Sequence, residues 1–418
     1  MQRSVLVISV IVIIGAIAYM ATRPVAAPAA TPNGVSVPTA AVALDQSTVF
    51  GPTQADSGPA TSTSSPGDWM MEGSNPARTR TTPAILNIPL NQRREIGIAG
   101  TDENASPPVI TRGMLLTETS KNLRAFDLAT GQQRWVFSEV GSYISPAVAG
   151  ERVFIRAEAD NKGQLYALNL RTGQKLWSFT PRRISSSVNN YYGGHLTSPV
   201  IISDVVFVGA GKEVYALDAA TGATRWEFAA QDYITSSPAI ANGQIYISDF
   251  RYVYAIDQQK GTLRWSFPIE TAFSFSSVAA DKTLLIASGK KLIALDSATG
   301  MQRWQLEIAG QSLIPAGADA TRAYVKSTET LIALDLATGK ELWRFHDLNY
   351  VSLPVLSGQH VYVVSGAGVD TVISALDVEN GTSIWKQPVQ KLANTAPVIA
   401  GGAIYVRTND GRILAFSS

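Results

Sequence analysis

The chain has 418 residues, of which 45% are hydrophobic and 16% charged, so it has enough apolar material for a large core. Its 34 Lys and Arg against 33 Asp and Glu leave a net charge of +1, and no overall field exists to attract nucleic acid. The chain has no cysteine, which excludes disulfides, zinc–thiolate sites, c-type haem attachment, a lipidated N-terminal cysteine and cysteine nucleophiles.

Residues 1–21 carry the pattern of a membrane segment. No charge occurs from Ser4 to Ala21, and Arg3 precedes this stretch. As a helix it would be roughly 27 Å long, close to the thickness of a bilayer core. We expect an uncleaved anchor, the alternative being a signal peptide cleaved near Ala16-Ile17-Ala18. An anchor and a signal peptide both predict that the rest of the chain is exported. An anchor also predicts a single-pass protein of the cytoplasmic membrane.

Residues 22–66 are rich in Pro, Ala, Ser and Thr, with Arg23, Asp45 and Asp56 as their only charges. Such a composition buries too little apolar surface to offset the entropy of ordering. We therefore predict a disordered linker, ahead of a single folded domain at 67–418.

The domain consists of an internal repeat with a period near 40 residues, which is typical of propellers and solenoids. One copy reads VYALDAATGATRW from Val214 to Trp226, and another reads LIALDLATGKELW from Leu331 to Trp343. Seven copies end in an aligned tryptophan: Trp135, Trp177, Trp226, Trp265, Trp304, Trp343 and Trp385.

Each repeat can be divided into four short strands. In the run Ser198–Ala210, the Ser203-Asp204 pair separates two apolar strands. The strand VYAL follows, and then the turn DAATG, in which Asp218 can bond backbone amides and Gly222 can take positive φ. TRWEF is the fourth strand. Because no segment after residue 67 has a helical stripe, four antiparallel strands per repeat predict an all-β propeller.

The blade count follows from the ends of the repeat. Seven complete blades run from about Pro108 to Lys386, and the tail Thr395–Phe416 supplies three strands of an eighth. The stretch Asn91–Ala99 fits the missing fourth strand, with Glu95 at the tryptophan position. We predict an eight-bladed ring closed by this N-terminal strand, since an unpaired edge invites aggregation. The alternative is seven blades and a loose hairpin.

The repeated YALDxxTGxxxW resembles the PQQ-like β-propeller repeat, which quinoprotein dehydrogenases share with the outer-membrane β-barrel assembly lipoprotein. The segment Asp68–Arg80 also looks like the lead-in found ahead of such propellers. The resemblance implies that each aligned tryptophan docks against the neighbouring blade. It also makes the motif's polar residues turn-formers rather than catalytic acids: Asp127, Asn169, Asp218, Asp257, Asp296, Asp335 and Asp377.

Quinoproteins of this family commonly have a vicinal cysteine pair, a calcium held by side-chain oxygens and often a haem. This chain lacks cysteine, and its three histidines, His195, His346 and His360, lie in separate repeats. Asp232, Glu270 and Asp347 lie near blade junctions, where solvated loop charges are common. We therefore predict no catalytic residue, no metal and no cofactor, although the sequence leaves catalysis open.

The function that these features favour is a non-catalytic, membrane-tethered scaffold that binds a protein partner outside the cytoplasm, similar to the β-barrel assembly propeller. We expect a monomeric propeller with no nucleic-acid partner. Two alternatives stay open: a PQQ-dependent quinoprotein oxidoreductase, and a surface protein that binds a cell-wall glycan or another ligand.

Loop lengths indicate where a partner would bind. The connection Thr180–Leu196 is the one expanded link between blades, and the loops 157–164 and 365–372 are also extended. All three are expected on one face of the ring, and function tends to lie on variable loops. The alternative is a solvated loop that merely drifted in length. The connection contains residues typical of interface hot spots, and the candidate partner-binding residues are Arg182, Arg183, Tyr191, Tyr192 and His195.

Overall fold

The computed structural model describes residues 68–98, 106–119, 122–139, 145–159, 162–182, 197–270, 276–346 and 350–418. The chain divides into two units, 1–58 and 59–418, and all described residues belong to the second. The predicted anchor and linker, 1–21 and 22–66, lie outside the described residues. Within the described part of the chain, no helix is long and apolar enough to cross a membrane.

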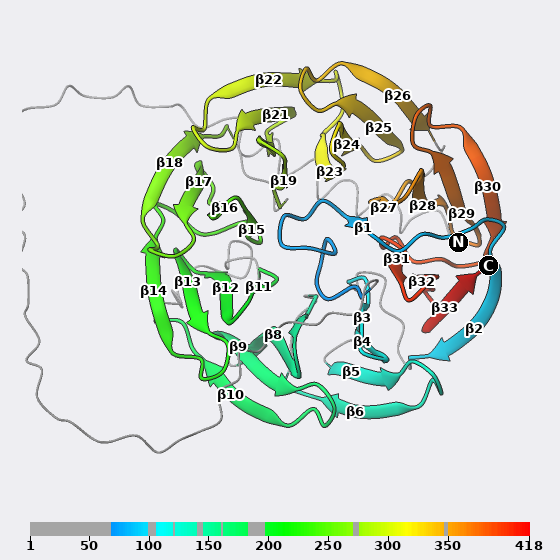
Figure 1. The fold of residues 1–418 in the computed structure, drawn as a ribbon, viewed down its shortest axis with the longest axis horizontal. Helices are drawn as coiled ribbons and strands as arrows, with labels where there is room; N and C mark the ends of the chain where they lie inside the picture. The colour runs from blue at the N-terminus through cyan, green and yellow to red at the C-terminus, as the bar shows by residue number, and fades with distance from the viewer. Residues whose placement is uncertain are drawn as a thin grey trace, which may run out of the picture. The chain divides into compact units, whose positions relative to one another are not determined.

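Eight sheets, one per blade, are arranged as a ring around a central axis (Figure 1). This confirms the predicted eight-bladed propeller. Blades 1 to 4 consist of β3 (Val109–Thr111), β4 (Met114–Thr119), β5 (Asn122–Asp127) and β6 (Gln133–Phe137); β7 (Ala147–Ala149), β8 (Arg152–Ala159), β9 (Lys162–Asn169) and β10 (Lys175–Phe179); β11 (Val200–Ile202), β12 (Val205–Ala210), β13 (Glu213–Asp218) and β14 (Thr224–Ala229); β15 (Ala239–Ala241), β16 (Gln244–Ser248), β17 (Tyr252–Asp257) and β18 (Leu263–Pro268).

The other four blades follow in chain order, and the last takes its outer strand from the N-terminal part of the domain. Blade 7 also has a fifth strand, β1, which runs parallel to β27. Blades 5 to 8 consist of β19 (Val278–Ala280), β20 (Thr283–Ser288), β21 (Lys291–Asp296) and β22 (Gln302–Glu307); β23 (Ile314–Ala318), β24 (Arg322–Lys326), β25 (Thr330–Asp335) and β26 (Glu341–His346); β1 (Thr81–Thr82), β27 (Val355–Ser357), β28 (His360–Ala367), β29 (Asp370–Asp377) and β30 (Ser383–Pro388); β31 (Val398–Ala400), β32 (Ala403–Arg407), β33 (Arg412–Ser417) and β2 (Asn91–Gly97).

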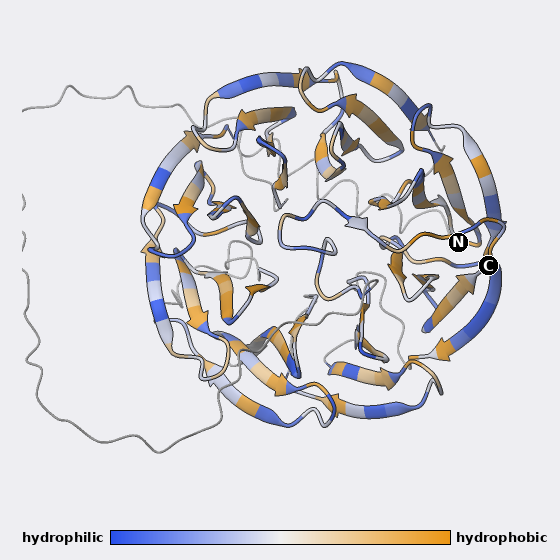
Figure 2. Cartoon of the chain, in the orientation of Figure 1, coloured by the Kyte–Doolittle hydropathy of each residue, from blue (hydrophilic) through white to orange (hydrophobic). Residues whose placement is uncertain are grey.

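The core lies between adjacent blades, because the inner three strands of each blade are buried on both faces. In blade 3, β13 is almost fully buried, whereas the outer strand β14 alternates exposed and half-buried residues. Figure 2 shows this contrast around the ring, with hydrophilic segments concentrated on the outer strands. Continuous β-branched and aromatic runs favour the buried inner strands, and the alternating pattern suits an outer strand with one face in water.

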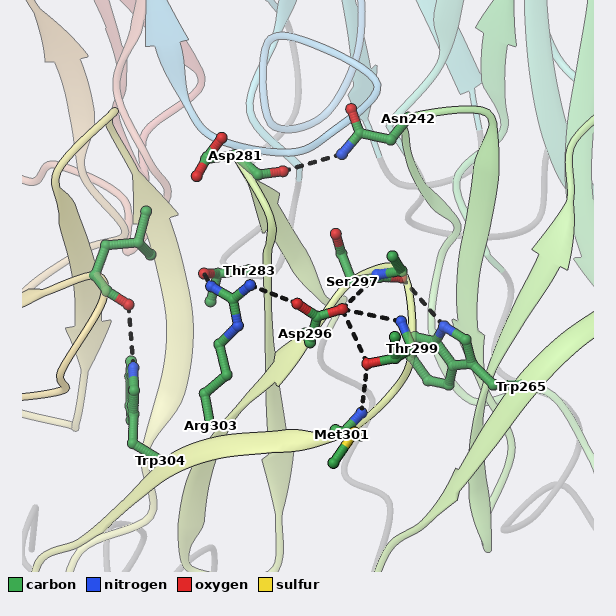
Figure 3. Close-up of polar contacts among 12 residues, drawn as sticks. Asn242, Trp265, Asp281, Thr283, Asp296, Ser297, Thr299, Met301, Arg303 and Trp304 are labelled. Atoms are coloured by element: carbon green, nitrogen blue, oxygen red, sulfur yellow. Dashed lines mark hydrogen bonds and ion pairs between the residues drawn. The ribbon is translucent and has the colours of Figure 1, made fainter.

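The indole of each docked tryptophan bonds the next blade. The Trp265 Nε1 donates to the backbone oxygen of Ser297, 3.1 Å away, in the following turn (Figure 3). In every such case the acceptor is the residue just after the turn-forming Asp or Asn. The other pairs are Trp135 with Leu170, Trp177 with Ala219, Trp226 with Gln258, Trp304 with Leu336, and Trp343 with Val378.

The ring of each tryptophan also lies flat against the turn glycine of that next blade. A Cβ added to Gly300 would be only 2.6 Å from Trp265 Cδ2, closer than real Cβ atoms approach. The same close approach occurs at five further glycines: Gly173, Gly222, Gly261, Gly339 and Gly381. A large aromatic and a missing side chain are therefore complementary at six blade junctions.

Strand β2 closes the ring by pairing antiparallel with β33. Its register corrects one expectation: Arg94, and not Glu95, lies opposite Ala415, the position that faces tryptophan in the other blades. β2 has a bulge between Gln92 and Arg94, equivalent to the bulge before each tryptophan, so Arg94 follows the bulge as Trp226 does in blade 3. The Arg94 guanidinium donates to the backbone oxygen of Leu128, so it bonds the same carbonyl position as the indoles do.

Closure predicts a specific truncation effect. Removing residues 68–98 should lower the thermal midpoint by ~10 °C or more, because it exposes the edge of β33 and removes six side chains that are at most 3% exposed: Trp69, Met71, Leu86, Leu90, Ile96 and Ile98. Each contributes ~1.5–3 kcal/mol when buried. Calorimetry measures the midpoint, and removing residues 1–67 is the control that should leave it unchanged. Equal midpoints for both truncations would contradict closure by β2.

The docking contact predicts different effects at two glycines with similar backbones. Gly300 and Gly243 have φ of +73° and +71°, but nothing lies within 4 Å of a Cβ at Gly243. Gly243→Ala should cost ~1–2 kcal/mol, the price of a left-handed backbone. Gly300→Ala should cost ~1–3 kcal/mol more, because the new methyl group collides with Trp265. Urea unfolding measures the free energy of unfolding of both variants. Equal losses of stability would mean that the indole is not tightly packed against Gly300.

Candidate functional site

The two faces of the ring differ in the loops that they carry. The turn face carries the loops between the first and second strands and the DxxTG turns between the third and fourth. The connection face carries the loops between the second and third strands and the links from blade to blade. Strands β8 and β9, and likewise β28 and β29, are each eight residues long, so the extended hairpins of blades 2 and 7 project on the connection face.

Of the predicted partner-binding residues, the structure describes Arg182. Its guanidinium is 3.0 Å from the Glu227 carboxylate, and its side chain is 77% exposed. Its backbone N–H points to the Tyr215 hydroxyl at 3.4 Å. Burial raises the pKa of Tyr215, so this hydroxyl stays protonated. The remaining candidates lie outside the described residues: Arg183, Tyr191, Tyr192 and His195.

A second feature of the connection face was not predicted. A groove of about 550 Å³ lies between the link 310–312 and the loop 327–330, beside Arg344 and His346. The His346 Nδ1 is 3.2 Å from the Thr330 hydroxyl. Gln311 lines the groove, and its buried Oε1 accepts no hydrogen bond. A buried acceptor without a donor is costly, and it would suit an N–H from a bound chain.

The turn face carries carboxylates that cap the DxxTG turns. Asp296 Oδ1 accepts from the N–H groups of Ala298 and Thr299, and its Oδ2 is 2.5 Å from Arg303 (Figure 3). These bonds, above all that from Arg303, lower the pKa of Asp296 to about 2. In blade 2, Asn169 caps its turn in the same way. An amide suffices at that position, so the turn carboxylates are structural.

The other candidate groups are dispersed. Asp232 is 3.7 Å from Lys212 and 3.5 Å from Arg251, and Glu270 is 2.7 Å from Lys291. Among the described residues, no three His, Asp or Glu side chains are grouped so that they could hold a metal ion. Asp347 and His195 lie outside the described residues.

The axis of the ring is filled by residues 68–82, which we call the axial segment (Figure 1, the blue trace at the centre). Its carbonyls accept hydrogen bonds from the innermost strands of successive blades. The first is a two-way pair between Trp69 and Ile110 of blade 1. The later donor and acceptor pairs are Val148 to Met70, Ile240 to Pro76, Ala279 to Ala77, Ala318 to Thr79, and Leu356 to Arg80.

The axial segment carries two buried arginines, Arg78 and Arg80, which are 4% and 6% exposed. Arg78 donates from Nε to the Pro238 carbonyl at 2.7 Å and pairs with Glu72 at 3.0 Å. Burial raises the pKa of Glu72. The two arginines and the Ser198 hydroxyl lower this pKa by more than burial raises it, so the net shift is downward. Burial lowers the pKa of Arg80 to about 10, so this arginine stays charged at neutral pH.

Two cavities of the ring, one beside Arg78 and Arg80 and one on the turn face, are a poor match for a quinone with its metal. The cavity beside Arg78 and Arg80 is about 100 Å³, whereas cofactor pockets usually measure ~300–1000 Å³. A cavity of about 750 Å³ on the turn face places Asp281, Asp296 and Asp319 against a single Lys282, which would repel an anionic cofactor. No redox step follows from the residues that line these two cavities.

The fold and its docking contacts define an all-β, eight-bladed propeller that is closed and filled by its own N-terminal residues. The chain belongs to the family described as outer membrane protein assembly factor BamB, whose model matches residues 84–179, 161–322 and 327–418. This bears out the resemblance of the repeat. No curated protein matches the sequence.

Solved structures of two functional classes share the fold. BamB from Moraxella catarrhalis has a TM-score of 0.58 at 20% identity, over 79% of this chain and 100% of that one. A europium-containing methanol dehydrogenase has a TM-score of 0.67 at 14% identity, over 84% and 98%. The quinohemoprotein alcohol dehydrogenase from Comamonas testosteroni has 0.61 at 14%, over 86% and 81%. At these identities the likeness shows the fold alone.

The capped turn predicts a pH-dependent effect. Asp296→Asn should keep the cap but lose the ion pair with Arg303, a cost of about 0.5 kcal/mol at pH 7. The folded-state pKa is about 2, below the unfolded value of about 3.9. The contribution is therefore present above pH 4 and is lost as the pH falls through 2. Urea unfolding from pH 7 to 2 should show the gap between wild type and variant closing, and a constant gap would contradict this assignment.

Proposed function

We propose that this protein is a non-catalytic scaffold, tethered to the cytoplasmic membrane by residues 1–21, whose propeller binds a protein partner on the extracytoplasmic side. The observation that carries the proposal is membership of the BamB family across most of the domain. The name of the family refers to the assembly of outer membrane proteins, and this chain keeps the whole ring. The tether and its location rest on the uncharged run Ser4–Ala21.

The connection face is the proposed binding surface. Its loops vary in length while the turns opposite stay short and capped, and variable loops on a rigid scaffold commonly carry function. The groove beside Gln311 offers a buried acceptor without a donor. The link 180–196 adds arginines and tyrosines, which dominate binding energy at interfaces. We expect the ring to bind as a monomer.

A quinoprotein oxidoreductase is the competing class, because methanol and alcohol dehydrogenases share the fold. Against it stand the absence of cysteine in the sequence and the small cavity at the buried arginines. The two classes are distinguished by adding pyrroloquinoline quinone with calcium to the purified protein. Dye-linked oxidation of an alcohol would overturn the scaffold proposal.

The binding surface can be tested by crosslinking in intact cells, using the cysteine-free background. Ser312→Cys places a thiol in the groove, and Met301→Cys places one on the turn face, where Met301 is 71% exposed. With a membrane-impermeant bifunctional maleimide, Ser312→Cys should capture a discrete protein and Met301→Cys should be modified without capture. Replacing Arg182, Arg183, Tyr191 and Tyr192 together by Ala should reduce capture at least tenfold while leaving the thermal midpoint unchanged.

Three results would contradict parts of the proposal separately. Modification of neither cysteine until the cells are lysed would overturn the extracytoplasmic location. Capture from Met301→Cys alone would move the partner to the turn face. Undiminished capture by the fourfold variant would remove the 180–196 link from the binding surface.

A further inference from the structure

The cavity beside Arg78 and Arg80 is lined by more positive charge than the neighbouring carboxylate neutralises. Arg78 Nη2 and Arg80 Nη1 are both buried and have no hydrogen-bond partner. One carboxylate, Glu72, lines the cavity with these two guanidinium groups. The fixed charges at the cavity therefore sum to +1, in a place where an unpaired charge is expensive.

The surroundings supply further positive potential. Lys326, on β24, is 7% exposed, and its Nζ lies 4.6 Å from the centre of the Tyr350 ring. Its cross-strand partner Ile314 lines the cavity. Tyr350 also interacts with Arg80, which lowers the tyrosine's pKa against the larger effect of burial. An anion in the cavity would thus be attracted by two arginines and, at longer range, by a lysine.

The cavity's size restricts the occupant. At about 100 Å³, it is larger than the ~30 Å³ that one water molecule occupies in the liquid. It is far smaller than the ~300–1000 Å³ of a site for a cofactor or a drug-sized ligand. Water would satisfy the two free N–H groups but would leave the charge uncompensated. A small oxyanion does both, and guanidinium groups bind such anions in bidentate fashion.

We propose that Arg78 and Arg80 form a binding site for a small inorganic oxyanion of the size of phosphate, enclosed between the axial segment and the inner strands of blades 5 and 6. The walls contributed by the blades and their links are Ser276, Val278, Ile314, Pro315 and Leu353. The anion therefore joins the axial segment to the ring, and it stabilises the closed propeller. The proposal does not depend on the proposed protein partner.

The first test is anion-dependent stability of the full chain. Inorganic phosphate, titrated against chloride at constant ionic strength, should raise the thermal midpoint of the wild type saturably by a few degrees. Arg80→Met should abolish the rise, and Arg80→Lys should weaken it. Arg251→Met is the matched control, because Arg251 is 73% exposed at the rim, and it should respond like the wild type.

The second test does not depend on any variant folding. Crystals of the wild-type chain soaked in selenate should show an anomalous peak within hydrogen-bond distance of Arg78 Nη2 and Arg80 Nη1. Ordered water alone in the cavity would overturn the proposal. So would a phosphate response that is equal in the wild type and Arg80→Met. Loss of the partner capture described above, with the selenate peak intact, would overturn the proposed function and leave this site standing.

Discussion

The contact between a tryptophan and the turn glycine of the next blade is the interaction on which this molecule depends. Each blade is a small sheet that cannot bury its own faces, so the ring is stable only if every junction is well packed. The indole supplies area against the glycine and one hydrogen bond to a backbone oxygen, as Trp265 does to Gly300 and Ser297. Because the bond uses main chain, turn side chains can vary without weakening it.

The two junctions of the closing blade show how the docking contact is replaced where the repeat begins and ends. At the start of the ring, Arg94 takes the tryptophan position and bonds the Leu128 carbonyl with its guanidinium. At the other end, Trp385 packs against a cluster that contains Ile96 and Phe416, from the two strands β2 and β33 of the closing blade. N-terminal and C-terminal residues thus complete one blade, and the axial segment then bonds the inner strands of blades 1, 2, 4, 5, 6 and 7.

A closed ring separates stability from binding. The turn face is committed to capped turns such as that of Asp296, and its loops have little freedom to change. The docked indoles pack on glycines of the DxxTG turns, so a link on the connection face, such as 180–196, can lengthen without changing those contacts. In our account the protein binds its partner there and uses the axis for a small anion.

The sequence was sufficient to predict the blades, because the motif ending at Trp226 or Trp343 repeats the turn, the glycine and the docking residue at fixed spacing. It was also sufficient to predict closure by residues 91–97. The prediction was wrong by one residue at Glu95, because β2 has no tryptophan to mark the docking position. The dipeptide Arg93-Arg94 aligns with Arg134-Trp135, and this alignment could have indicated the true register.

The axial site could not be predicted in the same way. Residues 72–80 have no periodicity, and Arg78 and Arg80 resemble surface residues in the sequence. Their burial follows from the path of the segment through the ring. The segment passes close to Gly317, where an added Cβ would lie only 2.9 Å from the Thr79 carbonyl oxygen. Only contacts between segments distant along the chain reveal the cavity and its excess charge.

Hydrogen exchange of the full chain in membranes, with and without its captured partner, shows whether a rigid ring presents one face to that partner. We expect added protection in peptides that cover 157–164, 180–196, 310–312 and 365–372, with none in the DxxTG turns. Added protection in those turns, or none on the connection face, would contradict it.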